Sequence, residues 1–516
     1  MIAVQLNRRD FEYDIHSLVK AFYPGKDVSV FCEEEAENAE LKISVFFEIK
    51  DHDPADTSSC EMEEKDAVNY GNCEIKIEIE KKQMQESGQE SADEAVSGRR
   101  IFDQVRLVEN ADRKEAKNQL KRLLYRMLHR FTGQDLPWGN LTGIRPTKIP
   151  MALLEQGWKN VDIARYMRDT YYTSNAKTAL AISIANRERH ILKDINYENG
   201  YSLYVGIPFC PSICLYCSFS SSPIHIWKKR VDEYLDALCH EIDAVSEIFA
   251  GRELNTVYIG GGTPTTLEPE QLDRLLNKLE EKFDYSHLQE FTVEAGRPDS
   301  ITREKLQVLR DHRISRISIN PQTMNQKTLD IIGRKHTVKE TIDAFWLARS
   351  LGFDNINMDL IVGLPGEGKE EVQHTMEEIS KLDPDSVTVH SLALKRAARL
   401  NLFKEEYQEI SFQNSSEIMD MTARYCQEKG LAPYYLYRQK NMAGNFENVG
   451  YAKEGKAGIY NILIMEEVQS ILALGAGAST KLVYAKDRIE RIENVKDIKN
   501  YIERIDEMIE RKKKMQ

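Results

Sequence analysis

The stretch YSLYVGIPFCPSICLYC, residues 201–217, joins a β-prone run to a loop that carries three cysteines. Aromatic and β-branched residues favour strands and proline ends them, so SLYVGIP predicts a strand that leads directly into the loop. Cys210, Cys214 and Cys217 follow at steps of four and three residues, in a chain that has 8 cysteines in all. This position and spacing predict a single metal site at the end of the strand.

The predicted metal site lacks a fourth protein ligand. A structural zinc is normally closed by four ligands, but no cysteine or histidine lies within seven residues after Cys217, and His225 is eight away. Three thiolates that hold a [4Fe–4S] cluster would leave one iron without a protein ligand and free to bind a small molecule. The three cysteines therefore favour a catalytic iron–sulfur cluster over a structural zinc.

Composition narrows the class of protein. The remaining cysteines are scattered without regular spacing, which is typical of a reducing compartment rather than of a disulfide framework. The formal net charge of −13 argues against general attraction to nucleic-acid phosphates, so an anionic substrate needs a local basic pocket. No stretch approaches the length of an uncharged membrane span, and the N-terminal residues contain no signal-like run. We expect a cytoplasmic protein with no membrane span and no nucleic-acid partner.

From residue 200 onward, six β-rich runs alternate with amphipathic helical patterns. The runs are YSLYVGIP, NTVYIGGG, EFTVEAG, SRISIN, NINMDLIVGL and DSVTVHSL. Their spacing of roughly 25 to 50 residues suits helical crossovers between parallel strands and excludes hairpins. We therefore predict an α/β fold with a partial (β/α)6 barrel over residues 200–400, and its chemistry at the carboxyl ends of the strands.

Residues 1–135 are predicted to form an N-terminal α+β accessory domain. Strand-like runs at 41–50 and 73–82 lie on either side of an acidic, polar stretch. Residues 136–199 are predicted to be a helical linker region, because helical patterns follow a segment rich in glycine and proline.

Residues 401–516 are predicted to form a mostly helical C-terminal domain that covers the substrate. A stripe of β-branched residues recurs there at helical spacing: Ile489, Ile492, Val495, Ile498, Ile502 and Ile505. We expect them to form the core-facing stripe of one final helix.

Glycines and polar residues gather at the predicted carboxyl ends of the other strands. GGGTPT, residues 260–265, follows the second strand, and its glycines would let the backbone approach a ligand closely. Glu294 ends the third strand, Gln322 follows the fourth, and Asp359 lies near the end of the fifth. A carboxylate can accept hydrogen bonds from both ribose hydroxyls, and Gln322 with Arg334 could satisfy a carboxylate or a ribose edge. Taken singly, each of these residues could equally well cap a loop.

In this order, the motifs resemble the radical S-adenosylmethionine (SAM) superfamily, whose members carry Cys-x3-Cys-x2-Cys after the first strand of a (β/α)6 barrel. In that superfamily the open iron is chelated by SAM, and an electron from the reduced cluster cleaves the sulfonium to a 5′-deoxyadenosyl radical. The resemblance implies a [4Fe–4S] cluster and SAM as cofactors. It also implies a small electron-donor protein of the flavodoxin or ferredoxin type.

From Tyr204 to about Ser479, the chain resembles the oxygen-independent coproporphyrinogen III oxidase family. The motifs are YVGIPFCPSICLYC, GGGTPT, the strand-three glutamate, PQT, IGRKH, DLIVGLPGE and GAGAS. The N-terminal extension, LTGIRPTKI, HSLALKR and YYLYRQKNMAGNFENVGY resemble its long, HemZ-type branch. The resemblance implies an anaerobic oxidoreductase of porphyrin (haem) biosynthesis. It would convert two propionates of the tetrapyrrole coproporphyrinogen III into vinyl groups, with loss of CO2, to give protoporphyrinogen IX.

The family resemblance also implies roles for single residues. Cys210, Cys214 and Cys217 would hold the cluster. Tyr204 and His390 would be catalytic, with His390 able to bind substrate or donate a proton; a structural histidine is the alternative. The residues that would bind SAM are Tyr204, Tyr216, Gly261, Gly262, Thr263, Glu294, Gln322, Arg334 and Asp359.

The implied substrate carries four carboxylates, so this acidic protein must gather cations locally. The candidates follow the sixth strand and the aromatic stretch PYYLY; a solvated charged loop is the alternative for each. They are Lys395, Arg396, Arg399, Arg438 and Lys440.

The chain departs from the pattern of the well-characterised oxidases at Phe219 and in lacking a Tyr- and Arg-rich segment ahead of the cluster, so other functions stay open. Phe219 stands where those oxidases have a further cysteine, and the related haem chaperones share this Phe-type motif. Those chaperones bind haem through His-Asn-x-x-Tyr-Trp, but in ENVGYA, residues 447–452, Glu447 replaces the histidine and Ala452 the tryptophan. The alternatives are a haem-binding, chaperone-like protein and a radical SAM enzyme that acts on another tetrapyrrole, for example by methyl transfer with haem-ring opening. No second SAM site is predicted, because the chain lacks the Tyr- and Arg-rich segment ahead of the cluster.

Overall fold

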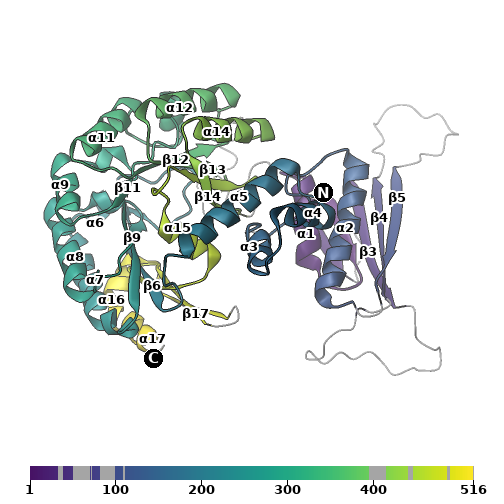
Figure 1. Ribbon diagram of the computed structural model, residues 1–516, viewed down its shortest axis with the longest axis horizontal. Helices are drawn as coiled ribbons and strands as arrows, with labels where there is room; N and C mark the ends of the chain where they lie inside the picture. The colour runs from purple at the N-terminus through teal and green to yellow at the C-terminus, as the bar shows by residue number, and fades with distance from the viewer. Residues whose placement is uncertain are drawn as a thin grey trace. The chain divides into compact units, whose positions relative to one another are not determined.

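The computed structural model describes residues 1–32, 39–49, 70, 73–81, 99–108, 111–143, 145–393, 414–439, 446–484 and 488–514. The chain divides into two compact units (Figure 1): unit 1 is Met1–Gly143 with Gly157–Leu180, and unit 2 is Ile144–Gln156 with Ala181–Gln516. The predicted domain limits at residues 135, 199 and 400 stay predictions. Among the described residues, no helix combines the length and the apolar character needed to cross a bilayer.

Unit 1 contains one five-stranded sheet in the order β2-β1-β3-β4-β5, with β1 parallel to β2 and β3 and the other pairs antiparallel. Ile75, Ile77 and Ile79 alternate along β4 and are buried in one core with Leu120 and Leu124 of helix α2. The two runs predicted as strands form β3 and β4, so the α+β prediction is confirmed. The elements are β1 (Ile2–Leu6), α1 (Glu12–Phe22), β2 (Val28–Cys32), β3 (Leu41–Ile49), β4 (Cys73–Lys81), β5 (Arg100–Arg106), α2 (Arg113–Thr132) and α4 (Asn160–Tyr171).

Two further helices lie in the region predicted to be a helical linker. They are α3 (Lys148–Glu155) and α5 (Asn175–Leu192).

Six parallel strands form the centre of the sheet of unit 2, and they correspond to the six β-rich runs of the sequence. Their order in the sheet is β6-β9-β10-β11-β12-β13, so each run pairs with its neighbours along the chain. The predicted partial (β/α)6 barrel is confirmed. The strands are β6 (Gly200–Ile207), β9 (Glu253–Gly261), β10 (Glu290–Glu294), β11 (Arg316–Ser318), β12 (Ile356–Val362) and β13 (Ser386–Ser391).

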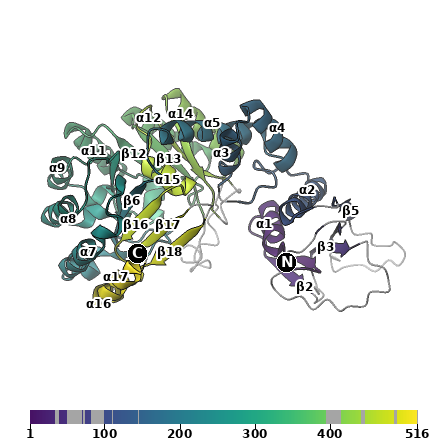
Figure 2. The same ribbon diagram turned by 60° about the horizontal axis from the view of Figure 1, so that its bottom comes forward.

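The crossover helices lie on the outer side of this curved sheet in both views (Figures 1 and 2). In α8, Leu272, Leu275, Leu276 and Leu279 are buried at helical spacing, so one face of the helix covers the sheet. Thr337 begins α11 with a capping box. These outer helices are α7 (Val231–Val245), α8 (Pro269–Lys282), α9 (Arg303–Asp311), α11 (Val338–Ser350) and α12 (Lys369–Leu382). The same part of the chain also contains two short helices, α6 (Ile224–Trp227) and α10 (Gln326–Ile331).

The described residues beyond 413 add strands to both edges of the same sheet. At one edge β15 pairs antiparallel with β13, and β14 with β15; at the other, β16 pairs parallel with β6 and is followed by β17 and β18. The sequence pattern predicted helices here but not these strands. The elements are α14 (Ser416–Glu428), β14 (Ala432–Tyr437), β15 (Asn448–Ala452), α15 (Ile459–Glu466), β16 (Ser470–Leu474), β17 (Ser479–Val483), β18 (Ile489–Glu493), α16 (Ile498–Glu503) and α17 (Ile505–Lys513).

The prediction of one final helix from Ile489 is wrong. Ile489 and Ile492 lie in β18, which pairs with β17 in an antiparallel hairpin. Pairing with a neighbouring strand overrides a short helical spacing, because the hairpin satisfies the backbone of both strands. The helical part begins only after Asp497, whose side chain accepts a hydrogen bond from the Asn500 backbone and caps α16.

A buried ion pair joins the last helix to the first long crossover helix. Glu241 of α7 and Lys512 of α17 form it, and both side chains are 0% exposed. The Glu241 carboxylate also accepts hydrogen bonds from Tyr501 Oη at 2.6 Å, Asn494 Nδ2 at 2.8 Å and the Gly475 backbone N–H at 2.9 Å. A buried carboxylate with this many donors is well satisfied, and removal of one partner leaves an uncompensated charge.

We predict that Lys512→Met destabilises the protein by about 3–5 kcal/mol, since Glu241 would stay buried without its cation. The free energy of unfolding, measured by urea titration with near-UV circular dichroism, tests this. Lys513→Met is the matched control, because the Lys513 side chain is 48% exposed and pairs with Glu510 at the surface. It should change the free energy by less than about 0.5 kcal/mol. Equal effects of the two substitutions would contradict the importance of the buried pair.

Candidate functional site

The three cysteines lie in a closed loop directly after β6. We call residues 208–222 the cysteine loop, because the Ser222 backbone N–H donates to Pro208 O at 2.8 Å and the short strands β7 (Phe209–Cys210) and β8 (Ser222–Pro223) pair at its base. Within the loop, the Cys217 backbone N–H donates to Cys214 O at 3.1 Å. The loop is also tied to the end of α10, where Ile332 O accepts from the Leu215 backbone at 2.9 Å.

The cysteine thiols fit the donor set of an iron–sulfur cluster. Burial raises the pKa of Cys210, and it raises that of Cys217 to about 11; the Cys214 thiol adds to both shifts. In the part of the chain that is described, no three His, Cys, Asp or Glu side chains converge as ligands of a single metal ion do. A cluster differs from a single ion in this respect, because its thiolates bind separate irons. The donor set therefore suits a cluster held by three thiolates.

The glycine-rich turn after β9 packs against the chain that enters the cysteine loop. The Gly262 and Thr263 backbone N–H groups donate to Ile207 O and Phe209 O, both at 2.7 Å. A Cβ atom on Gly262 would lie 2.4 Å from Phe209 O, and Gly261 has a φ of +103° that other residues rarely adopt. Packing and backbone conformation within the protein are thus enough to require glycine at both positions, whether or not a ligand binds there. The binding of SAM by Gly261, Gly262 and Thr263 stays a prediction.

Asn320 connects Glu294, at the end of β10, to Asp359, in the middle of β12. Asn320 Nδ2 donates to Glu294 Oε2 at 3.2 Å, its Oδ1 accepts from the Asp359 backbone N–H at 3.2 Å, and Tyr258 Oη donates to Glu294 Oε1. Burial and the charge of Asp359 raise the pKa of Glu294 from 4.5 to about 7, although the bonds from Tyr258 and Asn320 oppose this. Glu294 can therefore both donate and accept hydrogen bonds near neutral pH.

Asp359 is kept ionised by its neighbours on β12 and β13. Asn357 Nδ2 donates to Asp359 Oδ1 at 2.7 Å, and His390 Nε2 lies 3.8 Å from Oδ2. Burial acts to raise the pKa of Asp359, but His390 and Asn357 outweigh it and hold the pKa below its ordinary value. His390 Nδ1 lies 3.4 Å from Tyr437 Oη on β14. The structure thus brings the predicted residues Glu294, Asp359 and His390 into one connected group.

Gln322 continues the parallel pairing beyond the end of β11. Its backbone N–H donates to Asp359 O at 3.0 Å, and its carbonyl accepts from Ile361 at 2.9 Å. Its φ of +66° lies in the left-handed region, which costs free energy for a residue other than glycine and tends to occur at functional sites. These two backbone hydrogen bonds to β12 hold Gln322 in this conformation.

Arg334 lies beside the cysteine loop, next to Tyr216 of that loop. Arg334 is buried, and its Nη1 donates to the carbonyls of Asn320 and Gly296, the latter at 3.3 Å. Burial acts to lower the pKa of Arg334, but contacts with Tyr216 and Cys214 outweigh burial and raise it. Its described partners are therefore protein groups in and next to the cysteine loop.

Tyr204 lies on β6, inside the barrel. Its ring stacks on Tyr258 at 6.4 Å between centroids, and Tyr258 stacks on Tyr460 at 4.5 Å. Burial raises the pKa of Tyr204, with a smaller contribution from Glu294. These rings bring apolar surface up to the Glu294 carboxylate.

Of the predicted substrate cations, only Arg438 can be placed. Lys395, Arg396, Arg399 and Lys440 lie outside the described residues. Arg438 follows β14 and is buried, so the alternative of a solvated loop is wrong for it. Burial lowers its pKa to about 10, and the charge of Glu447 opposes that shift.

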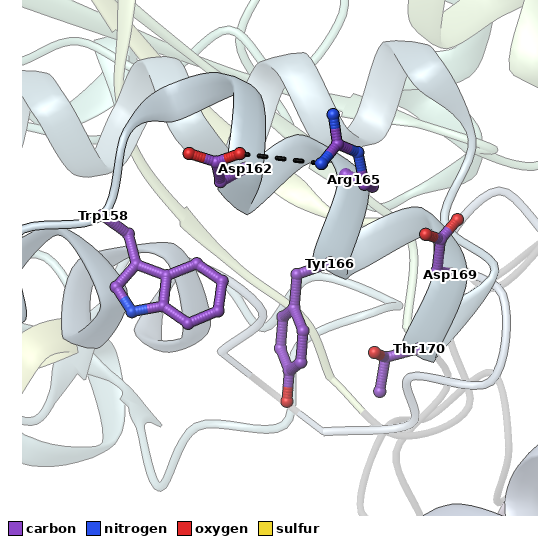
Figure 3. Close-up of a pocket in the computed structure, with 6 residues that line it drawn as sticks. All are labelled: Trp158, Asp162, Arg165, Tyr166, Asp169 and Thr170. Carbon is purple, nitrogen blue, oxygen red and sulfur yellow. Dashed lines mark ion pairs between the residues drawn. The ribbon is translucent and has the colours of Figure 1, made fainter.

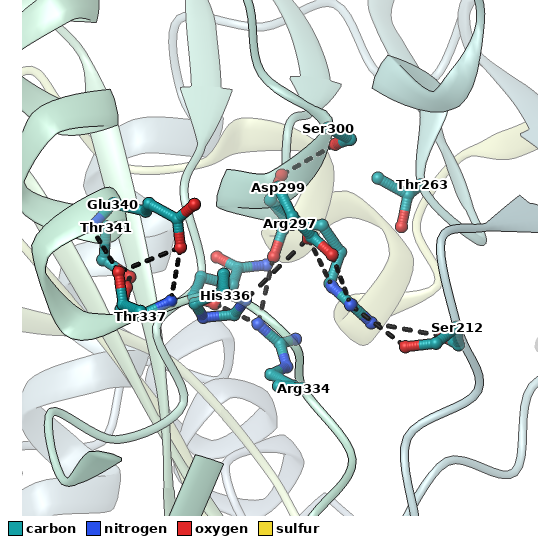
Figure 4. A network of polar contacts seen from close by, with 12 residues as sticks. Ser212, Thr263, Arg297, Asp299, Ser300, Arg334, His336, Thr337, Glu340 and Thr341 are labelled. Atoms are coloured by element: carbon teal, nitrogen blue, oxygen red, sulfur yellow. Dashed lines mark hydrogen bonds and ion pairs between the residues drawn. The ribbon is translucent and has the colours of Figure 1, made fainter. Parts of the chain in front are cut away.

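The sequence pattern missed Arg297 and its partner Asp299, which lie next to the cysteine loop (Figure 4). Arg297 Nε and Nη2 donate to the two Asp299 carboxylate oxygens at 2.9 and 2.8 Å, and Nη2 donates to Ser212 Oγ at 3.1 Å. The triplet Arg-Pro-Asp directly after the third strand was the available signal, since it follows a predicted site residue at a strand's carboxyl end.

A cavity of about 480 Å³ lies in unit 1, lined by none of the predicted site residues (Figure 3). Trp158 and Tyr166 meet there edge to face at 5.8 Å, and Arg165 Nη1 lies 3.8 Å from Asp162 Oδ1. Asp169 and Thr170 complete its lining.

Comparisons with known proteins match the barrel, and in part a longer stretch of the chain, to proteins of one superfamily. Residues 204–379 match the Radical SAM superfamily. The chain is 42% identical over 404 residues to the oxygen-independent coproporphyrinogen-III oxidase-like protein HemZ of Bacillus subtilis (strain 168), covering 77% of this chain and 81% of HemZ. It is 32% identical over 316 residues to the heme chaperone HemW of the same organism, covering 59% of this chain and 76% of HemW. Among solved structures, coproporphyrinogen III oxidase (HemN) from Escherichia coli matches with a TM-score of 0.49 and 24% identity, over 62% of this chain and 73% of that one.

We predict a pH-dependent gain in stability for Glu294→Gln. Between about pH 4.5 and pH 7 the unfolded chain ionises Glu294 while the folded protein keeps its proton, so the parent loses stability as the pH rises through this window. The variant has no such loss. Its free energy of unfolding relative to the parent should increase by about 2–3 kcal/mol between about pH 5 and pH 8.

Urea titration of both proteins at each pH measures this difference. Subtraction removes the pH-independent loss of the contacts with Tyr258 and Asn320. A difference that stays flat across the range would show that Glu294 titrates at its ordinary pKa.

Proposed function

The chain belongs to the family of oxygen-independent coproporphyrinogen-III oxidase-like proteins within the radical SAM superfamily, and on that premise we propose that it oxidatively decarboxylates coproporphyrinogen III. The superfamily uses a [4Fe–4S] cluster and SAM. The proposed reaction converts two propionate side chains into vinyl groups and yields protoporphyrinogen IX without O2. The observation that carries the proposal is the 42% identity to HemZ over 81% of that protein.

In the proposed site, Cys210, Cys214 and Cys217 would hold the cluster and would leave one of its irons without a protein ligand, available to SAM. When bound, the cluster and SAM supply the radical chemistry that removes a hydrogen atom from an unactivated carbon. Glu294 and Asp359 are suited to bind ribose hydroxyls, because one carboxyl holds a proton near neutral pH while the other stays ionised. Tyr204 and Tyr258 exclude water from this part of the barrel, where both rings are packed.

At the other side of the proposed site, β13 and β14 present groups that suit the substrate's carboxylates. Arg438 is a buried cation, and His390 is held between Asp359 and Tyr437. A cation near a propionate keeps that group ionised, which the loss of CO2 requires. We assign Lys395, Arg396, Arg399 and Lys440 to the remaining carboxylates on sequence grounds.

The proposed reaction needs both an electron acceptor and an electron donor. Each propionate loses one hydrogen atom, one electron and CO2 as its vinyl group forms, so an electron acceptor must take up that electron. A small protein of the flavodoxin or ferredoxin type would supply the electron that reduces the cluster. We place the protein in the cytoplasm with these partners.

A second candidate function is haem binding of the chaperone type, which the 32% identity to HemW over 76% of that protein favours. Phe219 is also 72% exposed, so the residue shared with the chaperones lies at the surface beside the cluster cysteines. Against this candidate, Glu447 replaces the chaperone histidine and is buried at the start of β15. A titration of the purified protein with haem separates the two: a one-to-one Soret shift supports haem binding, and featureless spectra exclude it.

The oxidase proposal predicts that the reduced protein, incubated anaerobically with SAM and coproporphyrinogen III, forms harderoporphyrinogen and then protoporphyrinogen. Cys214→Ala should lose the cluster and reduce activity more than about 100-fold, since it removes a direct iron ligand. Cys239→Ala is the control, because this buried cysteine lies on α7 and not in the cysteine loop. Product masses, iron content and 5′-deoxyadenosine are measured together.

Cleavage of SAM without either product would reject the proposed substrate. A gain of mass on an added tetrapyrrole would instead assign the protein to methyl transfer. A gain and a loss of mass are distinguishable in the same experiment.

A further inference from the structure

Arg297 is a buried cation that contacts the cysteine loop at two residues. The side chain is 3% exposed, and it follows the carboxyl end of β10. Its Nη1 donates to Ser212 O at 3.2 Å and to Cys214 Sγ at 3.5 Å, and its Nη2 reaches Ser212 Oγ. One guanidinium therefore binds the backbone, a hydroxyl and a sulfur of the same loop.

Contacts outside the cysteine loop hold the Arg297 guanidinium in position. Asp299 accepts from Nε and Nη2 in a bidentate pair, which sets the plane of the group. The Arg297 carbonyl accepts from Ser300 Oγ at 2.7 Å (Figure 4). Ser300 Oγ in turn lies 2.6 Å from Thr265 Oγ1 in the glycine-rich turn. Arg297 thus connects the turn after β9 and the end of β10 to the cysteine loop.

We propose that Arg297 is a positioning residue that holds the cysteine loop and raises the reduction potential of the cluster through its hydrogen bond to Cys214. This inference rests on the proposed binding of the cluster by the three cysteines, and it is independent of which tetrapyrrole the protein uses. A charged N–H donor draws electron density from a cluster thiolate, so it stabilises the reduced state, which carries one more negative charge. Hydrogen bonds to the sulfurs are among the factors that set cluster potentials.

Arg334 also contacts Cys214, but its contacts differ from those of Arg297. Arg334 donates to the carbonyls of Gly296 and Asn320, which belong to the barrel and not to the cysteine loop. Arg297 donates to Ser212 as well as to Cys214. Loss of Arg297 would therefore remove one anchor of the loop and one sulfur contact together, while Arg334 would remain beside Cys214.

The test compares Arg297→Lys, Arg297→Gln and Ser212→Ala with the parent, each reconstituted with iron and sulfide under anaerobic conditions. The midpoint potential of the cluster is read by electron paramagnetic resonance during titration with dithionite. For Arg297→Gln we expect the one-electron equilibrium to shift at least tenfold toward the oxidised cluster, about 59 mV for a one-electron couple. The midpoint potential of Arg297→Lys should lie between those of Arg297→Gln and the parent, because an amine keeps the charge but cannot reach all the acceptors of the guanidinium.

Ser212→Ala should keep the parent potential, since it removes an anchor of the loop but not the contact to Cys214. Arg349→Gln is the control for loss of an arginine, because Arg349 pairs with Asp385 at the amino-terminal ends of the strands. If Arg297→Gln binds no cluster while Arg349→Gln does, the positioning role is supported and the potential is read in Arg297→Lys. A full cluster with the parent potential in both Arg297 variants overturns the inference. Failure to convert coproporphyrinogen III would bear on the proposed reaction alone.

Discussion

Parallel pairing of six consecutive strands is the constraint on which the site depends. Because β6, β9, β10, β11, β12 and β13 run in the same direction, their carboxyl ends meet at one edge of the sheet. Cys210 follows β6, Glu294 ends β10 and His390 is the penultimate residue of β13, so residues far apart in the chain lie toward the same edge of the sheet. The direction of the strands, rather than any one contact, therefore assembles the site.

Charge is distributed very unevenly in this protein. The chain has a formal net charge of −13, yet the described part of the barrel unit buries four arginines, Arg297, Arg316, Arg334 and Arg438. Each faces a partner suited to a cation: Asp299, Glu290, the Tyr216–Cys214 pair, or Glu447. Buried cations act over short distances with little screening, so an acidic protein can still bind anions in its interior.

The sequence predicted those features that local patterns encode. The six strands and the cysteine loop could be predicted because the residues that define a buried parallel strand or a ligand loop lie close together in the sequence. The strands β14 to β18 were missed because their pairing partners are distant or their spacing imitates a helix, as at Ile489 and Ile492. Arg297 was missed for a similar reason: its contacts with Ser212 and Cys214 exist only after folding. The glycines were found, but their packing against Phe209 could not be foreseen from the motif.

The strand that leads into the cysteine loop takes its second neighbour from a remote part of the chain. Tyr201 pairs with Ser470, and the register runs on to Val205 and Leu474. A fragment cut at residue 400 would leave this edge of β6 with unpaired N–H and C=O groups, and such an edge readily joins another chain. The isolated barrel segment would be prone to aggregate next to its own cysteines. The smallest fragment that closes this edge must therefore reach β16.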